Sequence, residues 1–414
     1  MEWIKSKLSD LIEEFERGIS YSSDEIKDNS GVPMMNLACI DKTGFYRDGE
    51  MKYFSGNYTD SDKVYPNDML VACTDLTRNA DVIGTPILVP QGADFYLYTM
   101  DLVKLTPKAN IDKMFLYYAL KTRTYRKYIK PWASGTTVLH LNLQGMYDYK
   151  LYYPKNKEDQ KKLAQVLADI DSKISLNKQI NQNLEALARQ LYDYWFVQFD
   201  FPDENGKPYK SSGGEMVYNE ILKREIPKGW EVKRIGNILG KVNTTPRLMT
   251  EDYLENGKYP IIDQTTNVYY AGFTDREEAV LNQYPAVVFG DHSCTVKYVN
   301  FPFARGADGT QVMLSNDISI SAEYLYFVVI NVKFVKGYAR HYSFLKDYPM
   351  VIPADHIASQ YRHQAQTFFE KITKNRIEQQ YLIKQRNELL PLLMNGQVNF
   401  DLLVWHALIL YIRV

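Results

Sequence analysis

A long helical repeat in the middle of the chain constrains the fold more than any other feature. The segment LAQVLADIDSKISLNKQINQNLEALARQLYDYW places residues of one face at alternating intervals of four and three. That spacing is the seam of a coiled coil. A helix of this length, about 50 Å at 1.5 Å per residue, cannot bury such a seam alone, so it needs a helical partner. The seam consists of Leu163, Leu167, Ile170, Ile174, Asn177, Asn181, Leu184, Ala188, Leu191 and Trp195.

A second stretch, from about Ala358 to Met394, can supply that partner. Its rougher seam is Phe368, Ile372, Asn375, Gln379, Leu382, Arg386, Leu389 and Leu393. Paired antiparallel, the helices would bring the polar centres of both seams together. Polar residues in a seam fix register at some cost in stability. The predicted register residues are Asn177, Asn181, Asn375 and Gln379. In the alternative arrangement, each helix packs separately on its own domain.

The chain repeats itself, and each copy leads into one of the two helices. Matched pieces occur in the same order, from Trp3 with Trp230, through YPNDMLV with YPAVVFG, to YYPKNKEDQ with MVIPADHIASQ. Collinear weak matches are stronger evidence than any single one. Each copy opens with short β-rich segments and continues with a helix and a last strand. We therefore predict an α+β chain, in which two globular α/β domains are joined by two long antiparallel coiled-coil helices in an internal pseudo-twofold repeat.

The predicted boundaries follow from these patterns. The first globular domain spans 1–155, the first helical spacer 156–199, a turn-rich connector 200–229, the second globular domain 230–354, the second spacer 355–396 and a tail 397–414.

Composition narrows the functional classes. The chain has 49 basic and 50 acidic residues, which argues against binding nucleic acid by bulk charge but allows local basic patches. The scattered Cys39, Cys73 and Cys294 favour a reducing cytoplasm. The start lacks an apolar signal region, and the apolar run near the end is too short to span a bilayer. We therefore expect a cytoplasmic protein with no membrane partner.

At this point the sequence resembles a known family. The block ASGTTVLHLNLQGMYDYKLYYPKNKEDQKKLAQVLADIDSKI, followed by NQNLEALARQLYDYWFVQFDFPDENGKPYKSSGGEMVYNEILKREIPKGWEVKRIG, is similar to the DNA-specificity subunit of type I restriction-modification systems. The resemblance covers about residues 1–398 and is most specific from Leu151 to Gly236. It implies a non-catalytic subunit whose two globular domains are target-recognition domains, each reading one half of a split, asymmetric double-stranded DNA sequence.

The resemblance also implies partners and cofactors. The helices would set the gap between half-sites and dock two methyltransferase subunits, which bind S-adenosylmethionine and methylate adenine. Restriction subunits that use ATP and Mg²⁺ would complete the assembly, translocate DNA and cut it. This chain itself would bind no cofactor and no metal. Two recognition domains held apart by a rigid helix pair would suit two DNA half-sites that lie about one turn of the double helix apart.

Candidate DNA contacts come from a basic helix face and from polar loops. Arg123, Arg126, Lys127 and Lys130 share one face of a predicted helix, and such cations neutralise phosphates. The alternative is an ordinary solvated face. Base readout needs polar side chains on loops. The further candidates are Arg78, Asn79, Thr136 and Thr137 in the first copy, and Arg305, Asp308, Gln311, Lys336, Arg340 and His341 in the second.

Two other functional classes stay open at this level. A solitary nuclease or methyltransferase would need a catalytic motif. The sequence NFPF at Asn300 lacks the second proline of the amino-methyltransferase motif. The pattern that resembles the nuclease motif PD-(D/E)xK, formed by PD at Pro202 and by Glu231 to Lys233, is short and common. Asp291-His292-Ser293-Cys294 has no second ligand pair for zinc. A coiled-coil scaffold without a DNA role is the third class.

Overall fold

The computed structural model describes residues 1–27, 30–41, 44–47, 49–266, 268–306, 308–334 and 341–397. It divides into two compact units, of which the first consists of two separate segments and the second of one long segment. Unit 1 contains Met1–Ser175 and Gln379–Val414, and unit 2 contains Leu176–Glu378. Each unit is therefore a globular domain together with part of both long helices, α4 (Lys157–Tyr192) and α8 (Asp355–Met394).

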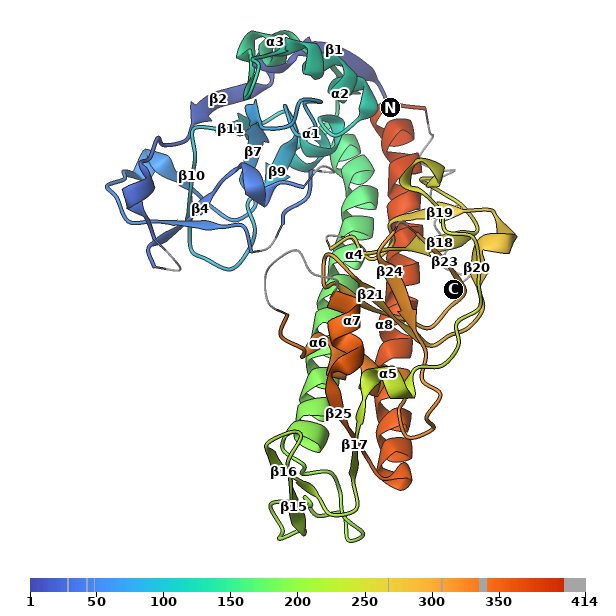
Figure 1. Cartoon of the computed structure of the whole chain (residues 1–414). Coiled ribbons are helices and arrows are strands. Elements are labelled where there is room, and N and C mark those ends of the chain that lie inside the picture. Colours follow the sequence, from blue (N-terminus) through green and yellow to red (C-terminus); the bar gives the residue numbers. More distant parts are fainter. Residues whose placement is uncertain are drawn as a thin grey trace. The chain divides into compact units, whose positions relative to one another are not determined.

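The two long helices pack side by side within each unit (Figure 1). In unit 1 the beginning of α4 lies against the end of α8, where Asp171 and Arg386 form an ion pair of 3.0 Å. In unit 2 the end of α4 lies against the beginning of α8, where Glu185 and Arg376 are 2.7 Å apart. This order means that the helices run antiparallel, as predicted. All ten predicted seam positions of α4 are buried or half-buried, which confirms the coiled-coil seam.

Unit 1 is built on small sheets covered by short helices. Its central antiparallel sheet has the order β2 (Ile12–Arg17), β11 (Leu102–Pro107), β7 (Met69–Ala72) and β9 (Pro86–Leu88). A five-stranded sheet lies next to it in the order β3 (Ile26–Lys27), β5 (Lys52–Phe54), β4 (Val32–Met35), β10 (Tyr96–Tyr98) and β6 (Lys63–Val64). A three-stranded sheet contains β12 (Ala133–Ser134), β13 (Leu139–Leu141) and β8 (Thr74–Asp75). The helices are α1 (Lys113–Ala119), α2 (Arg123–Ile129) and α3 (Leu143–Asp148).

Unit 2 repeats this plan with fewer strands. One sheet has the order β19 (Gly272–Thr274), β18 (Tyr259–Ile262), β23 (Phe303–Arg305) and β20 (Val280–Leu281), and another has β22 (Val296–Val299), β21 (Ala286–Gly290) and β24 (Thr310–Met313). The helices are α5 (Ile235–Ile238), α6 (Ala322–Ile330) and α7 (His341–Asp347). A hairpin of β15 (Met216–Asn219) and β16 (Arg224–Pro227) lies in the connector.

One strand pair identifies the repeat in space. In unit 1 the opening strand β1 (Trp3–Lys7) pairs antiparallel with β14 (Lys150–Pro154), which directly precedes α4. In unit 2 the opening strand β17 (Glu231–Arg234) pairs in the same way with β25 (Pro349–Ile352), which directly precedes α8. The sequence match of Trp3 with Trp230 therefore marks equivalent positions, and the predicted internal repeat is confirmed.

The core of unit 2 shows how a long helix is joined to a globular domain. After α4 the chain makes a π-helical turn, Asp193–Val197, which inserts Trp195 and Phe196 into the core. The ring of Phe196 makes an edge contact with Tyr361 of α8 at 4.8 Å. Burying aromatic rings of this size contributes about 2–3 kcal/mol each, so this end of the helix pair is fixed to the domain.

Candidate nucleic-acid interface

In unit 1 the predicted base-reading residues lie on two neighbouring loops. Strand β8 ends at Asp75 and leads into the loop that carries Arg78 and Asn79. Its neighbour β13 begins at Leu139, directly opposite Asp75, and the turn that carries Thr136 and Thr137 comes just before it. Both loops therefore project from the same end of one sheet. All four side chains are exposed, so they form one polar edge that can face a DNA groove.

The predicted basic stripe on α2 divides into two pairs. Arg123 and Lys127 are exposed and stay predicted phosphate contacts. Arg126 instead donates to the carbonyl oxygens of Asp81 at 3.0 Å, Ala80 at 3.3 Å and Ile83. The Lys130 ammonium donates to the carbonyl oxygen of Asn79 at 3.1 Å. Two of the four predicted cations thus bind backbone carbonyls of the reading loop: Arg126, which is half-buried, and Lys130, which is still exposed.

Two residues of this edge were not identified from the sequence. Leu76 is 71% exposed beside the polar tip of the loop, although a leucine in TDLTRNAD could have drawn attention as an apolar residue in a polar turn. Apolar side chains on reading loops contact the methyl group of thymine. Asp75 is fully buried. No sequence signal separated it from the many solvated aspartates.

In unit 2 three loops meet at the equivalent edge. Strands β18 and β23 run parallel with Ile262 beside Arg305, and Gly290 of β21 lies opposite Thr310 of β24. The loops next to these positions are joined by Gln264. Its side-chain amide donates to the carbonyl oxygen of Asp308 at 2.9 Å, and its carbonyl oxygen accepts from the His292 N–H at 3.3 Å. Sequence reasoning missed Gln264, because its partners lie far away in the chain.

The predicted DNA-contacting residues of unit 2 differ in their solvent exposure and in their contacts. Asp308 is exposed and pairs with Arg247 at 3.3 Å. Arg305 is half-buried, and its burial lowers the pKa of the guanidinium. Its Nε atom is buried and has no hydrogen-bond partner among the residues described. Gln311 lies within β24 opposite Phe289 and is half-buried.

The basic segment before α7 gives a mixed outcome. Lys336 and Arg340 lie outside the described residues. His341 begins α7, is only 8% exposed and packs against the ring of Phe334 at 5.3 Å. Its imidazole therefore belongs to the domain interior and is not a surface contact, which corrects the prediction for this residue.

The four polar seam residues meet across the helix pair. The Asn375 side-chain amide donates to Asn181 Oδ1 at 2.8 Å, and Asn181 donates in turn to the carbonyl oxygen of Ile372 at 3.3 Å. Asn177 donates to Glu378 at 2.8 Å. Gln379 donates to the carbonyl oxygen of Ile174 at 3.3 Å. Their contacts suit a role in register, which stays a prediction.

An arginine of α8 holds each globular domain to the helices. In unit 1 the Arg386 guanidinium, paired with Asp171, lies 4.4 Å from the ring centre of Phe45. In unit 2 Arg376, paired with Glu185, lies 4.0 Å from the ring centre of Tyr269. Cation–π contacts of partly desolvated arginines stabilise such junctions by about 1–2 kcal/mol.

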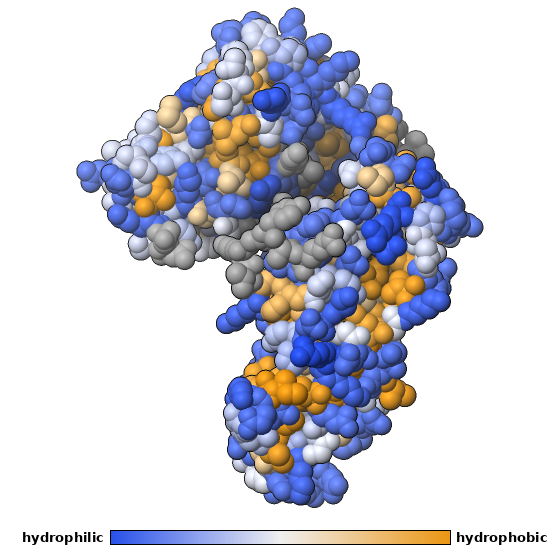
Figure 2. Space-filling view, in the orientation of Figure 1, coloured by the Kyte–Doolittle hydropathy of each residue, from blue (hydrophilic) through white to orange (hydrophobic). Residues whose placement is uncertain are grey.

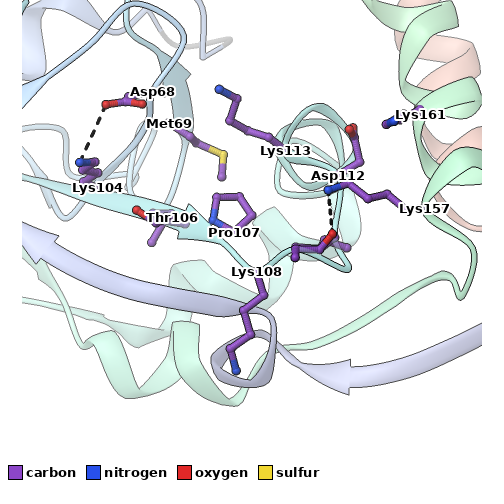
Figure 3. A pocket seen from close by; sticks show the side chains of 13 residues that line it. Asp68, Met69, Lys104, Thr106, Pro107, Lys108, Asp112, Lys113, Lys157 and Lys161 are labelled. Atoms are coloured by element: carbon purple, nitrogen blue, oxygen red, sulfur yellow. Dashed lines mark hydrogen bonds and ion pairs between the residues drawn. The ribbon is translucent and has the colours of Figure 1, made fainter.

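A pocket on unit 1 is rich in lysine (Figure 3). Its volume is about 490 Å³, and five lysines line it: Lys104, Lys108, Lys113, Lys157 and Lys161. It lies where Leu105 of β11 pairs with Met69 of β7, at the other end of β7 from the loop after Asp75. Lys104 approaches Asp68 at 3.9 Å, Lys161 approaches Glu158 at 2.7 Å, and Lys108 and Lys157 donate to backbone carbonyls. Two of the five lysines thus have an acidic partner within the unit, and two others bind backbone carbonyls.

The weak catalytic motifs are used structurally. The Asn300 side chain accepts a hydrogen bond from Thr373 at 2.6 Å. Lys233 of the nuclease-like pattern pairs with Asp317 at 3.0 Å, and Asp203 accepts the N–H groups of Asn205 and Lys207 in its own turn. Within the described part of the chain, no three His, Cys, Asp or Glu side chains gather into a metal-binding group. The same residues contain no helix that has both the length and the apolar character of a membrane span.

Comparison with known proteins gives the family. The sequence profile of the type I restriction modification DNA specificity domain matches residues 1–186 and 227–384. The type I restriction enzyme MjaIX specificity subunit of Methanocaldococcus jannaschii is 30% identical over 322 residues, which cover 72% of this chain and 72% of that protein. The HindI specificity subunit of Haemophilus influenzae is 25% identical over 389 residues, which cover 76% of this chain and 84% of that protein.

A solved structure agrees in fold. The S subunit of a type I restriction-modification system from M. genitalium has a TM-score of 0.58 at 16% identity, over 95% of this chain and 96% of that one. The family profile covers both repeats, and the resemblance drawn from the central block is confirmed. The chain therefore belongs to the type I restriction-modification DNA specificity family.

Proposed function

We propose that this chain is the subunit that selects the DNA sequence in a type I restriction-modification complex. Each unit reads one half of a split target, and because the two reading edges differ in side chains, the two half-sites differ in sequence. The observation that carries the proposal is the repeat itself, since two related domains on one antiparallel helix pair each present loops at the same edge of their sheets. A single compact reader would recognise one continuous site instead.

The chemistry of the complex resides in partner subunits. Two methyltransferase subunits bind S-adenosylmethionine and methylate adenine, and restriction subunits, where present, use ATP and Mg²⁺. In keeping with this division, Asn300 and Lys233, which belong to the two weak catalytic patterns, make structural contacts. The three cysteines are free thiols, which suits the reducing cytoplasm where such a complex would work.

A surface of unit 2 suits a protein partner. Figure 2 shows hydrophobic residues on the outside of unit 2 near the hairpin of β15 and β16. Val217, Tyr218 and Ile221 of this hairpin are 48%, 54% and 65% exposed. Apolar side chains grouped on a surface mark interaction sites in soluble proteins. Docking of a methyltransferase subunit here would cover them.

Mapping of adenine methylation tests the proposal. The chain is expressed with its methyltransferase subunit in a host that lacks adenine methylation, and modified bases are located by single-molecule sequencing. A two-part motif with a fixed gap is expected, and it should vanish when the gene for this chain is omitted. Methylation by this chain alone, supplied with S-adenosylmethionine and DNA, would instead favour a solitary enzyme. Absence of sequence-selective binding with all partners present would favour a scaffold.

A second experiment tests whether the length of the helices sets the gap between the two half-sites. Inserting one heptad into both α4 and α8 preserves the seam, because seven residues restore its phase, and lengthens the pair by about 10 Å at 1.5 Å per residue. The gap in the methylated motif should grow by about three base pairs, since DNA rises about 3.4 Å per base pair. An unchanged gap in the motif would show that the helices do not set it, and would leave the proposed selection of the DNA sequence unaffected.

A further inference from the structure

The loop that carries Arg78 and Asn79 is held from both sides by charged groups, a buried carboxylate and a half-buried guanidinium. On one side, the Asp75 carboxylate accepts the N–H groups of Thr77 at 2.7 Å, Val82 at 2.6 Å and Ile83 at 3.2 Å. A carboxylate that binds three peptide N–H groups holds them more firmly than a neutral acceptor would. Asp75 is fully buried, so water does not compete for these bonds.

On the other side, the Arg126 guanidinium holds the carbonyl oxygens of the same loop. It donates to Ala80, Asp81 and Ile83, while Lys130 holds Asn79. Anion and cation therefore act on one short stretch of backbone, the first on its donors and the second on its acceptors. The N–H of Ile83 donates to Asp75, and the carbonyl oxygen of Ile83 accepts from Arg126. Neither Asp75 nor Arg126 needs another ligand to be satisfied.

The backbone of this loop shows why it needs such support. Ala80 has a φ of 51°, in the left-handed region that costs an alanine about 1–2 kcal/mol. Residues persist in that region when surrounding contacts over-determine them, and they gather at functional sites. With the backbone fixed, the side chains of Leu76, Arg78 and Asn79 point to solvent from a single loop conformation.

We propose that Asp75 and Arg126 are positioning residues for base recognition by unit 1. They touch no DNA. They fix the loop so that Leu76, Arg78 and Asn79 meet base edges without an ordering cost at binding, and specificity at one half-site depends on them. This inference rests on the proposed function. It assigns selectivity to a buried carboxylate and a half-buried guanidinium, whereas unit 2 ties its loops together through the neutral amide of Gln264.

Three variants test the proposal in the full complex with its methyltransferase subunits. Asp75→Asn keeps the size of the side chain but replaces one acceptor oxygen by an amide donor, which would face a peptide N–H. Arg126→Lys keeps the charge but cannot hold three carbonyls as a planar fork does. Arg47→Lys is the matched control, because Arg47 is an exposed arginine of the same unit that has no place in the proposed DNA surface.

Competition binding compares the mapped target with duplexes that carry one base change in either half-site. We expect Asp75→Asn and Arg126→Lys to reduce discrimination about tenfold or more at the same single half-site. Discrimination at the other half-site, which also reports correct folding and assembly, should stay as in the wild type. Arg47→Lys should change neither.

The contrary outcomes are distinct. Unchanged discrimination in both variants, loss at both half-sites alike, or loss at different half-sites for the two variants would each overturn the positioning role. If Asp75→Asn does not assemble, Arg126→Lys alone decides between these outcomes, since it leaves the carboxylate side in place. A wild-type complex that does not discriminate between the duplexes would instead overturn the proposed function, and this is seen before any variant is measured.

Discussion

The buried pair of Asn181 and Asn375 gives the most direct test of how the helix pair is held. The two side chains are 6% and 8% exposed, and one hydrogen bond of 2.8 Å joins them. Replacing Asn181 by leucine removes the acceptor of the buried Asn375 amide, and replacing Asn375 removes the donor to the buried Asn181 Oδ1. A buried polar group that has lost its partner costs about 1–3 kcal/mol, so each single variant should lower the free energy of unfolding by about 2 kcal/mol.

Replacing both residues removes donor and acceptor together. The two leucines would extend the apolar seam, and such double replacements are nearly neutral or stabilising. We therefore expect Asn181→Leu/Asn375→Leu to lie within about 1 kcal/mol of the wild type or above it. The coupling energy of the double-mutant cycle would then be about 3 kcal/mol or more.

Urea unfolding, followed by circular dichroism of the helices, measures these changes. Hydrogen exchange of peptides from the second half of α4 shows whether the loss is local to the pair. The reasoning would be refuted if the single variants cost less than about 0.5 kcal/mol, or if the double variant lost the sum of the two. Either result would mean that water or another group satisfies these amides.

Three further predictions follow from individual contacts. Arg123→Ala/Lys127→Ala should reduce the slope of log K against log salt by about 2, since each phosphate contact contributes about 0.9, and an unchanged slope would exclude both residues from the DNA surface. Gly396→Ala should lower the thermal midpoint of unfolding more than Gly206→Ala does. Both glycines have left-handed φ angles of 68° and 74°, but only at Gly396 would the added Cβ meet Trp3, at 2.8 Å, so equal midpoints would argue against that contact. Burial lowers the pKa of Lys297 to about 8, below the unfolded value of about 10.4, so the unfolded chain binds more protons between these values and the stability contributed by this site should rise with pH from about 8 to 10. Lys297→Met should flatten that rise in a series of urea midpoints, and an identical profile in both proteins would contradict the shift.

Sequence periodicity predicted the parts of the fold that depend on neighbouring residues. The seams of α4 and α8, with Asn181 and Asn375 at their polar centres, could be read because an apolar helical face repeats at a fixed interval. The order of elements in the two repeats followed from collinear matches. The pairing of β1 with β14 was not predicted, since it joins residues almost a whole domain apart and leaves no local pattern.

The candidate site could be predicted only in part, for a similar reason. The spacing on α2 placed Arg126 on the same face as Arg123, but it held no information on the loop carbonyls that Arg126 binds. Burial separates Asp75 from a solvated aspartate, and burial is set by the packing of distant strands. His341 looked like part of a basic surface, yet Phe334 covers its ring. Residue type and spacing thus nominate surface groups, while tertiary contacts decide which of them reach solvent.

The division of each long helix between two compact units also has a consequence for substitutions. Unit 1 takes the beginning of α4 from its own repeat and the end of α8 from the other. The chain thus has the topology of a domain-swapped dimer within one polypeptide, with the residues between α4 and β17 joining its two halves. A substitution at a reading edge therefore acts within one repeat, whereas a substitution in the helix seam must also suit residues of the other repeat.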